Sequence, residues 1–147
     1  DVKVVGEKTS GHLAEARRVD IIVHTSSRIM TEVEKFPADF YLIDASGSMW
    51  NSWREWEDIV YASVKPGSKV YLSIMKGCSN GQRMSSVKPN SGTEIWYSYW
   101  KVLDYMRPGQ TLLIVSDFDS NYRLTDSEAR AIERKVAEKG VKVYTAQ

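Results

Sequence analysis

Cysteine and histidine are scarce in this chain, which has one Cys and two His among 147 residues. The single cysteine, Cys78, excludes an internal disulfide and a cysteine-based zinc site. His12 and His24 are too isolated in the sequence to be proposed as metal ligands. Because these residues supply no nucleophile with a paired base, we predict that the domain is not an enzyme.

Long hydrophobic runs and a strong charge of one sign are also lacking. No apolar run approaches the roughly 20 residues that a membrane-spanning helix needs, so we expect a soluble domain without direct membrane insertion. Lys and Arg number 20 against 19 Asp and Glu, which gives a net charge of +1. This balance creates no field that would attract nucleic acid or an anionic lipid surface, so we expect neither as a partner.

Hydrophobic residues make up 42% of the sequence, which is enough for one domain of this length to bury a core. Alternating and continuous apolar runs predict strands at 19–23, 39–44, 69–75, 83–87, 111–116 and 141–145. The pair Asn80-Gly81 favours a tight turn. The runs 69–75 and 83–87 are therefore predicted to form an antiparallel hairpin.

Three amphipathic helices are predicted between these strands. Apolar residues recur every three or four positions over 49–64 and over 94–106. A third helix opens with a capping box formed by Thr125 and Glu128 and ends at Gly140. Buried strands that alternate with one-sided helices indicate an α/β fold. We expect a doubly wound, Rossmann-like, mainly parallel sheet with one antiparallel hairpin strand and helices on both faces.

Oxygen-bearing side chains follow the central predicted strands, at the end of the sheet where such folds bind ligands. Asp44, Ser46 and Ser48 come directly after one central strand, Thr93 precedes the second helix, and Asp117 follows another central strand. Two carboxylates and three hydroxyls, without His or Cys, make a hard oxygen site with a net charge of about −2. This ligand set is typical of Mg²⁺, with Mn²⁺ or Ca²⁺ as alternatives.

Helix capping is the alternative explanation for these polar residues. Ser, Thr and Asp gather at strand-to-helix turns because their side chains bind free backbone N–H groups, and Ser48 or Thr93 alone fits that role. Capping explains single residues better than it explains all five together.

The three segments resemble the metal site of a known family. Asp44-Ala45-Ser46-Gly47-Ser48 matches the Asp-x-Ser-x-Ser signature of the metal-ion-dependent adhesion site in von Willebrand factor A-type and integrin inserted domains. Ser91-Gly92-Thr93 is similar to the threonine loop of that site, and Val115-Ser116-Asp117 is similar to its last aspartate segment. The resemblance covers roughly residues 38–147 and implies a von Willebrand factor A-type domain over that range.

This resemblance also implies how the cation would be held. Ser46, Ser48 and Thr93 would contact it through their hydroxyls, while Asp44 and Asp117 would act largely through bound waters. One coordination position would stay open for an acidic group of a partner protein.

The surroundings of the predicted site differ from the family in part. The family often has Asp-Gly in its last motif, whereas this chain has Asp117-Phe118-Asp119. The domain is also shorter than the integrin type. Asp119, Trp50 and Trp96 are predicted to form a rim around the metal that contacts the partner. Trp53 lies on the apolar stripe of the first helix, so we expect it in the core.

Residues 1–37 do not fit this pattern and resemble a second family. Val5-Gly6-Glu7-Lys8-Thr9-Ser10 and the later Arg17-Arg18-Val19-Asp20-Ile21 are similar to the closing segment of outer-membrane protein A-like peptidoglycan-binding domains. The resemblance implies a place in the periplasm or cell envelope of a Gram-negative bacterium; otherwise we expect an extracellular domain. The residues that grip peptidoglycan in that family are missing, so cell-wall binding is not carried over. An ordinary edge strand beside the sheet is the alternative explanation.

The sequence thus predicts a divalent-cation-dependent protein-binding module for adhesion or assembly, which binds an acidic group of a partner protein. One alternative is a Mg²⁺-dependent, aspartate-based phosphoryl-transfer enzyme, although Ser46 stands where that chemistry wants a second acid. Another alternative is a structural envelope domain whose metal site has degenerated.

Overall fold

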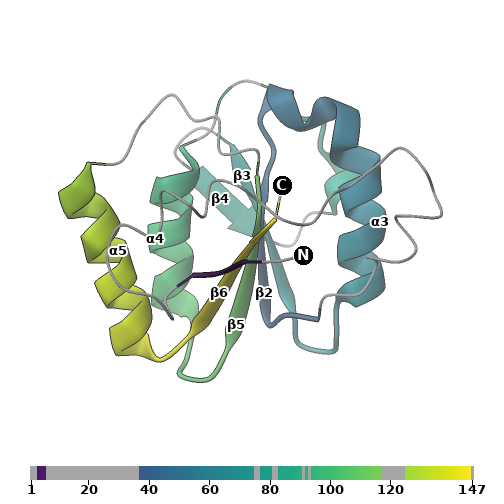
Figure 1. Cartoon of the computed structure of the whole chain (residues 1–147). Coiled ribbons are helices and arrows are strands. Elements are labelled where there is room, and N and C mark those ends of the chain that lie inside the picture. Colours follow the sequence, from purple (N-terminus) through teal and green to yellow (C-terminus); the bar gives the residue numbers. More distant parts are fainter. Residues whose placement is uncertain are drawn as a thin grey trace.

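The computed structural model of the chain describes residues 3–5, 37–74, 77–80, 83–90, 92, 94–116 and 125–146 (Figure 1). Within these ranges, strands alternate with helices along the chain. The strands are β1 Lys3–Val5, β2 Phe40–Asp44, β3 Lys69–Ile74, β4 Gly77–Asn80, β5 Thr111–Val115 and β6 Lys142–Ala146. The α-helices are α3 Trp53–Ser63, α4 Ile95–Tyr105 and α5 Asp126–Lys139, and the 3-10 helices are η1 Gly47–Ser52 and η2 Met84–Ser86.

The strands form one sheet in the order β1-β6-β5-β2-β3-β4. The four inner strands, β6, β5, β2 and β3, are parallel, whereas β1 pairs antiparallel with β6 and β4 pairs antiparallel with β3. From β2 the chain first adds β3 on one side and then returns to place β5 on the other side. The strand order therefore reverses between β2 and β5, as in a Rossmann-like α/β fold.

Helices cover both faces of this sheet (Figure 1), with α3 on one face and α4 and α5 on the other. The alternation of side chains along β2 explains why both faces are apolar. Phe40 and Leu42 pack in the core cluster that includes α4 and α5, whereas Tyr41 and Ile43 pack in the cluster that includes α3. The predicted doubly wound α/β architecture is thus confirmed.

The helix boundaries follow local signals in the sequence. The Thr125 hydroxyl accepts a hydrogen bond from the Glu128 backbone N–H at 3.1 Å, and the Glu128 carboxylate accepts one from the Thr125 N–H at 3.0 Å. This capping box starts α5, and Gly140 ends it with a positive φ of 67°. The predicted helix 49–64 begins instead as η1, and regular α-helix starts at Trp53.

The predicted strand 83–87, and with it the hairpin it forms with 69–75, is wrong. The antiparallel partner of β3 is β4, which ends at Asn80, and residues 84–86 form η2. A tertiary contact explains the difference, because the Trp53 indole N–H donates to the Met84 carbonyl oxygen at 2.9 Å. The predicted strand 19–23 lies outside the described residues.

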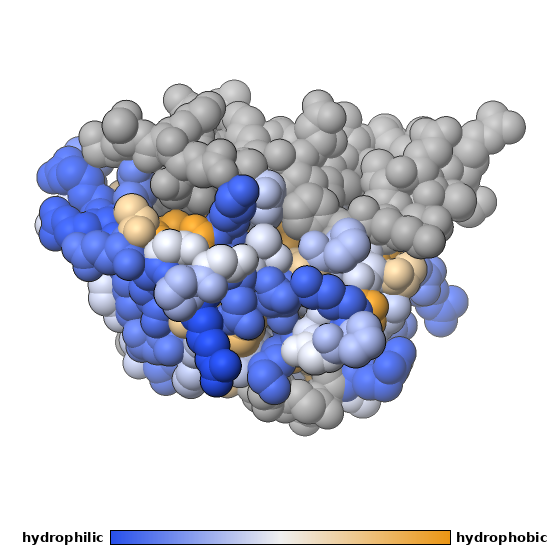
Figure 2. Space-filling model, turned by 90° about the horizontal axis from the view of Figure 1, so that it is seen from below, coloured by the Kyte–Doolittle hydropathy of each residue, from blue (hydrophilic) through white to orange (hydrophobic). Residues whose placement is uncertain are grey.

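The end of the molecule where β2 begins is mainly hydrophilic. Figure 2 shows this end from below, with small separate apolar areas among the described residues that are visible there. None of the helices in the described ranges is both long and apolar enough to cross a membrane.

Candidate functional site

Asp44 and Ser116 lie side by side at the carboxyl ends of two central strands. Asp44 is the last residue of β2, and Ser116 directly follows β5. These are the strands between which the order of the sheet reverses, and open α/β sheets bind ligands at that position. The fold therefore places the first predicted ligand, Asp44, where a ligand site is expected.

The Asp44 carboxylate is buried and held on both of its oxygens. Its Oδ1 accepts a hydrogen bond from the Ser46 backbone N–H at 2.8 Å, and its Oδ2 accepts one from the Ser116 hydroxyl at 2.5 Å. The residue is only 1% exposed. A buried carboxylate needs such partners to offset its loss of hydration, and these two bonds also fix its orientation.

The Ser46 and Ser48 hydroxyls lie next to each other, with their Oγ atoms 3.1 Å apart. Ser46 is buried and Ser48 is exposed, so the pair leads from Asp44 toward the surface. Ser46 occupies the N-cap position of η1, but its side chain makes no capping hydrogen bond. Ser48 lies within η1. The capping alternative therefore does not account for these two hydroxyls.

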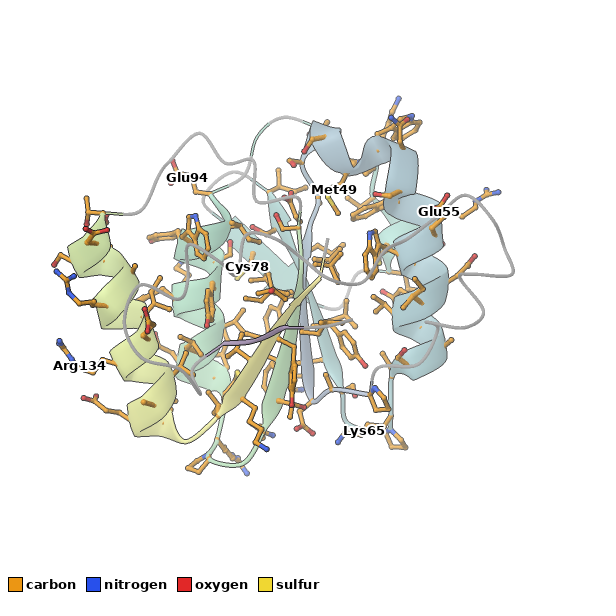
Figure 3. All side chains as sticks on the ribbon, in the orientation of Figure 1. Met49, Glu55, Lys65, Cys78, Glu94 and Arg134 are labelled. Carbon is orange, nitrogen blue, oxygen red and sulfur yellow. The ribbon has the colours of Figure 1, made fainter. Side chains whose placement is uncertain are left out.

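A second loop meets the Asp44 loop at the same end of the molecule. The Asn90 backbone N–H donates to the Ala45 carbonyl oxygen at 3.1 Å. Figure 3 places Met49, in η1, and Glu94, which precedes α4, at this upper end. Thr93, predicted as a ligand, lies outside the described residues, as do Asp117 and Asp119.

A buried pair of serines supports the site from below and was not predicted from the sequence. Ser73, in β3, lies in register with Asp44, and its carbonyl oxygen accepts from the Ala45 N–H at 2.9 Å. The Ser73 Oγ is 2.6 Å from the Oγ of Ser98 in α4, and both residues are fully buried. A serine that follows the apolar run Val70-Tyr71-Leu72 is the sequence signal that could have indicated it.

The two tryptophans predicted for the rim differ in exposure. Trp50, in η1, is 55% exposed, and the Lys88 ammonium lies 5.2 Å from the centre of its ring. Trp96 is only 4% exposed and packs with Tyr99 in the core on the α4 side. It therefore has little surface to offer a partner, and its place on the rim stays a prediction. Trp53 is buried, as predicted.

Cys78 lies in β4 and packs partly buried against the core on the α4 side. Burial raises the pKa of its thiol, and the nearby Lys101 ammonium only partly opposes this shift. The thiol is therefore protonated at neutral pH, which makes it a poor nucleophile and a poor metal ligand.

Comparisons with known proteins do not assign this chain to a family. No protein-family model matches the sequence, and no curated protein matches it. The function is therefore inferred from the residues that the fold brings together at the carboxyl ends of β2 and β5.

Proposed function

We propose that this protein is a protein-binding module in which a divalent cation, Mg²⁺ first of all, accepts a carboxylate from a partner protein. One observation carries the proposal. Asp44, Ser46 and Ser48 place a fixed carboxylate and two adjacent hydroxyls at the position where the strand order of the sheet reverses. The resemblance of the same residues to a metal-ion-dependent adhesion site supports this function, and we propose a von Willebrand factor A-type domain on that basis.

The spacing of the two hydroxyls fits a small cation. Oxygens that occupy adjacent corners of an octahedron around Mg²⁺, at about 2.1 Å from the ion, are about 3.0 Å apart. Around Ca²⁺, whose bonds of about 2.4 Å are often arranged as a pentagonal bipyramid, adjacent ligand oxygens are about 2.8 to 3.4 Å apart. The Ser46 and Ser48 Oγ atoms are 3.1 Å apart. This distance fits Mg²⁺, the similar Mn²⁺ and Ca²⁺ alike, and the preference for Mg²⁺ rests on the small number of charged ligands.

The hydrogen bonds of Asp44 support a role through bound water. Each of its carboxylate oxygens accepts a bond from the protein, which fixes the charge, and a carboxylate oxygen in general can share its lone pairs between a protein donor and a water. Ser46 and Ser48 would hold the cation directly, and the Asp44 charge would stabilise it at close range. Thr93 and Asp117 remain predicted ligands. The proposed place in a Gram-negative envelope rests on the sequence resemblance of residues 1–37.

Titration calorimetry with Mg²⁺ and Mn²⁺ tests the proposal. We expect the parent protein to bind both ions. The Ser46→Ala/Ser48→Ala variant keeps the bonds of Asp44 to the Ser46 backbone N–H and the Ser116 hydroxyl, and should lose most of the affinity. Asp58→Ala removes an exposed acid on α3 and is the matched control, which should bind as the parent does. Absence of both heat and thermal stabilisation in the parent would rule out a metal-dependent module.

Partner binding needs its own measurement. A pulldown from envelope extract should retain a partner with Mg²⁺ and release it with chelator, and the Ser46→Ala/Ser48→Ala variant should retain none. Mg²⁺-dependent hydrolysis of a phosphate ester that is lost in Asp44→Asn would instead favour the phosphoryl-transfer alternative.

A further inference from the structure

A groove of about 660 Å³ lies beside the candidate metal loop, between α3 with its preceding turn η1 and the segment 83–88. Trp50, Arg54 and Glu57 line one wall, and Ser85, Ser86 and Lys88 line the other. Trp50 is two residues from Ser48 and stands at the start of that wall. The groove therefore begins close in the chain to the exposed Ser48, one of the two residues that would hold the proposed metal.

Two hydrogen bonds hold the walls of this groove together. The Trp53 indole N–H donates to the Met84 carbonyl oxygen at 2.9 Å, and the Met84 N–H donates to the Tyr61 hydroxyl at 3.3 Å. The Arg83 guanidinium also lies over the Tyr61 ring, 4.3 Å from its centre. Because these contacts fix the segment 83–88 against α3, the groove is formed before any ligand arrives.

The charged groups in the groove have no ion-pair partner within the described part of the chain, although the Lys88 ammonium faces the Trp50 ring and the Ser86 hydroxyl donates to the Arg83 carbonyl oxygen. The ion pairs among the described residues join Lys65 to Asp39 and Lys135 to Asp104. Neither pair lies in the groove or involves Arg54 or Lys88. The Glu57 Oε2 atom is shielded from solvent but accepts no hydrogen bond from these residues. A shielded carboxylate oxygen without a donor is costly, so a ligand that supplies one is favoured.

We propose that this groove binds an extended acidic segment of the partner protein, next to the carboxylate that the metal would take. Acidic side chains of the segment pair with Arg54 and Lys88, and an apolar side chain covers the exposed Trp50 ring. A backbone N–H of the segment donates to Glu57. The contact of this segment with the metal rests on the function proposed above, whereas its contacts with Trp50, Arg54, Glu57 and Lys88 are independent of that function.

Charge decides between an acidic and a basic occupant. The groove is lined by two cations, Arg54 and Lys88, against the single carboxylate of Glu57. A cation held at Ser46 and Ser48 would add further positive charge at the end near Trp50. A basic segment would face repulsion from all three, whereas an acidic segment is repelled only by Glu57, whose oxygen its backbone satisfies.

A fluorescent peptide of alternating Asp and Leu, blocked at both ends, is a direct probe. Fluorescence anisotropy in Mg²⁺ should show binding that weakens with salt, and the NMR signal of the Trp50 indole should shift. The Arg54→Glu/Lys88→Glu variant should lose roughly tenfold or more in affinity, which corresponds to about 1.4 kcal/mol. Arg134→Glu changes an exposed cation on the far side of the molecule, on α5, and should bind as the parent does (Figure 3).

The outcomes separate this inference from the proposed function. If calorimetry shows Mg²⁺ binding but the acidic peptide leaves the Trp50 signal unchanged, the groove assignment is overturned and the metal module stands. If Mg²⁺ does not bind but the peptide still requires Arg54 and Lys88, the groove stands and the metal module fails. Stronger binding of a matched peptide of alternating Lys and Leu, lost in Glu57→Gln, would overturn the acidic occupant.

Discussion

Ser116 donates its hydroxyl to Asp44 Oδ2 over 2.5 Å, although the two residues are 72 positions apart in the chain. The bond joins the ends of β5 and β2, the two parallel strands between which the strand order of the sheet reverses. Because both residues are buried, water cannot replace the Ser116 hydroxyl without a local rearrangement. Ser116 therefore sets the orientation in which the Asp44 carboxylate faces the proposed cation.

Replacing Ser116 by Ala should weaken Mg²⁺ binding by roughly tenfold and lower the free energy of unfolding by about 1–3 kcal/mol, the cost of losing a hydrogen bond to a buried charged group. Calorimetry and urea unfolding measure the two effects. Ser127→Ala, an exposed serine in α5, is the control and should change neither. An unchanged Mg²⁺ affinity in a folded Ser116→Ala protein would show that this bond does not orient Asp44 for the metal.

Mg²⁺ should raise the melting temperature of the parent protein, because an ion that binds only the folded state stabilises it by mass action. At a concentration of about 100 times its Kd, this stabilisation is about 2.7 kcal/mol. Thermal unfolding followed by circular dichroism, with and without chelator, measures it. The Ser46→Ala/Ser48→Ala variant should show the same melting curve in both conditions. A melting temperature of the parent protein that changes with neither Mg²⁺ nor Mn²⁺ would count against the proposed metal site.

Local periodicity was enough to predict the central sheet and its helices. The strands that became β2, β3, β5 and β6 were predicted within one or two residues, because their apolar residues alternate or run continuously and are bounded by turn residues. The ends of α5 could also be predicted, since the capping box at its start and Gly140 at its end each act on backbone groups a few residues away. Both kinds of signal lie within short segments of the chain.

Contacts between distant segments could not be predicted in this way. The Trp53 bond to Met84 draws the segment 83–87 into η2, and nothing within that segment indicates it. The burial of Trp96 depends on how α4 lies on the sheet. At the site, the motif that begins at Asp44 could be recognised in the sequence. Its hydrogen bond to Ser116 could not be predicted, because that bond depends on the pairing of β2 with β5.

Asp39 should make the free energy of unfolding depend on pH in the acidic range. Burial acts to raise the pKa of its carboxyl, but the Lys65 ammonium at 3.0 Å and hydrogen bonds from Thr111 outweigh it and lower the pKa below 3.8. The unfolded state therefore binds the proton more readily. The stabilising contribution is fully present above pH 3.8 and is lost as the pH falls through the lower folded value.

Asp39→Asn should accordingly lower the free energy of unfolding by about 1 kcal/mol at pH 7 and have a smaller effect at acid pH. Urea unfolding at a series of pH values provides the comparison. Asp58→Asn, at an exposed position on α3, should leave the pH profile as it is in the parent. An Asp39→Asn protein with the same acid sensitivity as the parent would mean that other carboxyl groups control it.

Thr125→Ala should destabilise the protein by about 1 kcal/mol, the usual cost of removing an N-cap side chain. The substitution removes the hydroxyl that accepts from the Glu128 N–H and leaves that donor without its partner in the capping box. Chemical unfolding measures the change, and Ser127→Ala in the same turn is again the control. Equal effects of the two substitutions would show that the capping box contributes nothing beyond helix propensity.

The hydroxyls of Ser73 and Ser98 form a buried pair that connects the end of β3, beside Asp44, to the first turns of α4. Removing either hydroxyl takes away this 2.6 Å bond in an environment that is fully buried, so each single change to Ala should cost about 1–3 kcal/mol. Removing both takes away the same bond only once. The double variant should therefore cost less than the sum of the single changes, by about 0.5–3 kcal/mol. Urea unfolding of the four proteins gives this coupling energy directly. If the two costs simply add, the hydroxyls act independently, and the position of α4 relative to the Asp44 loop does not depend on the bond between them.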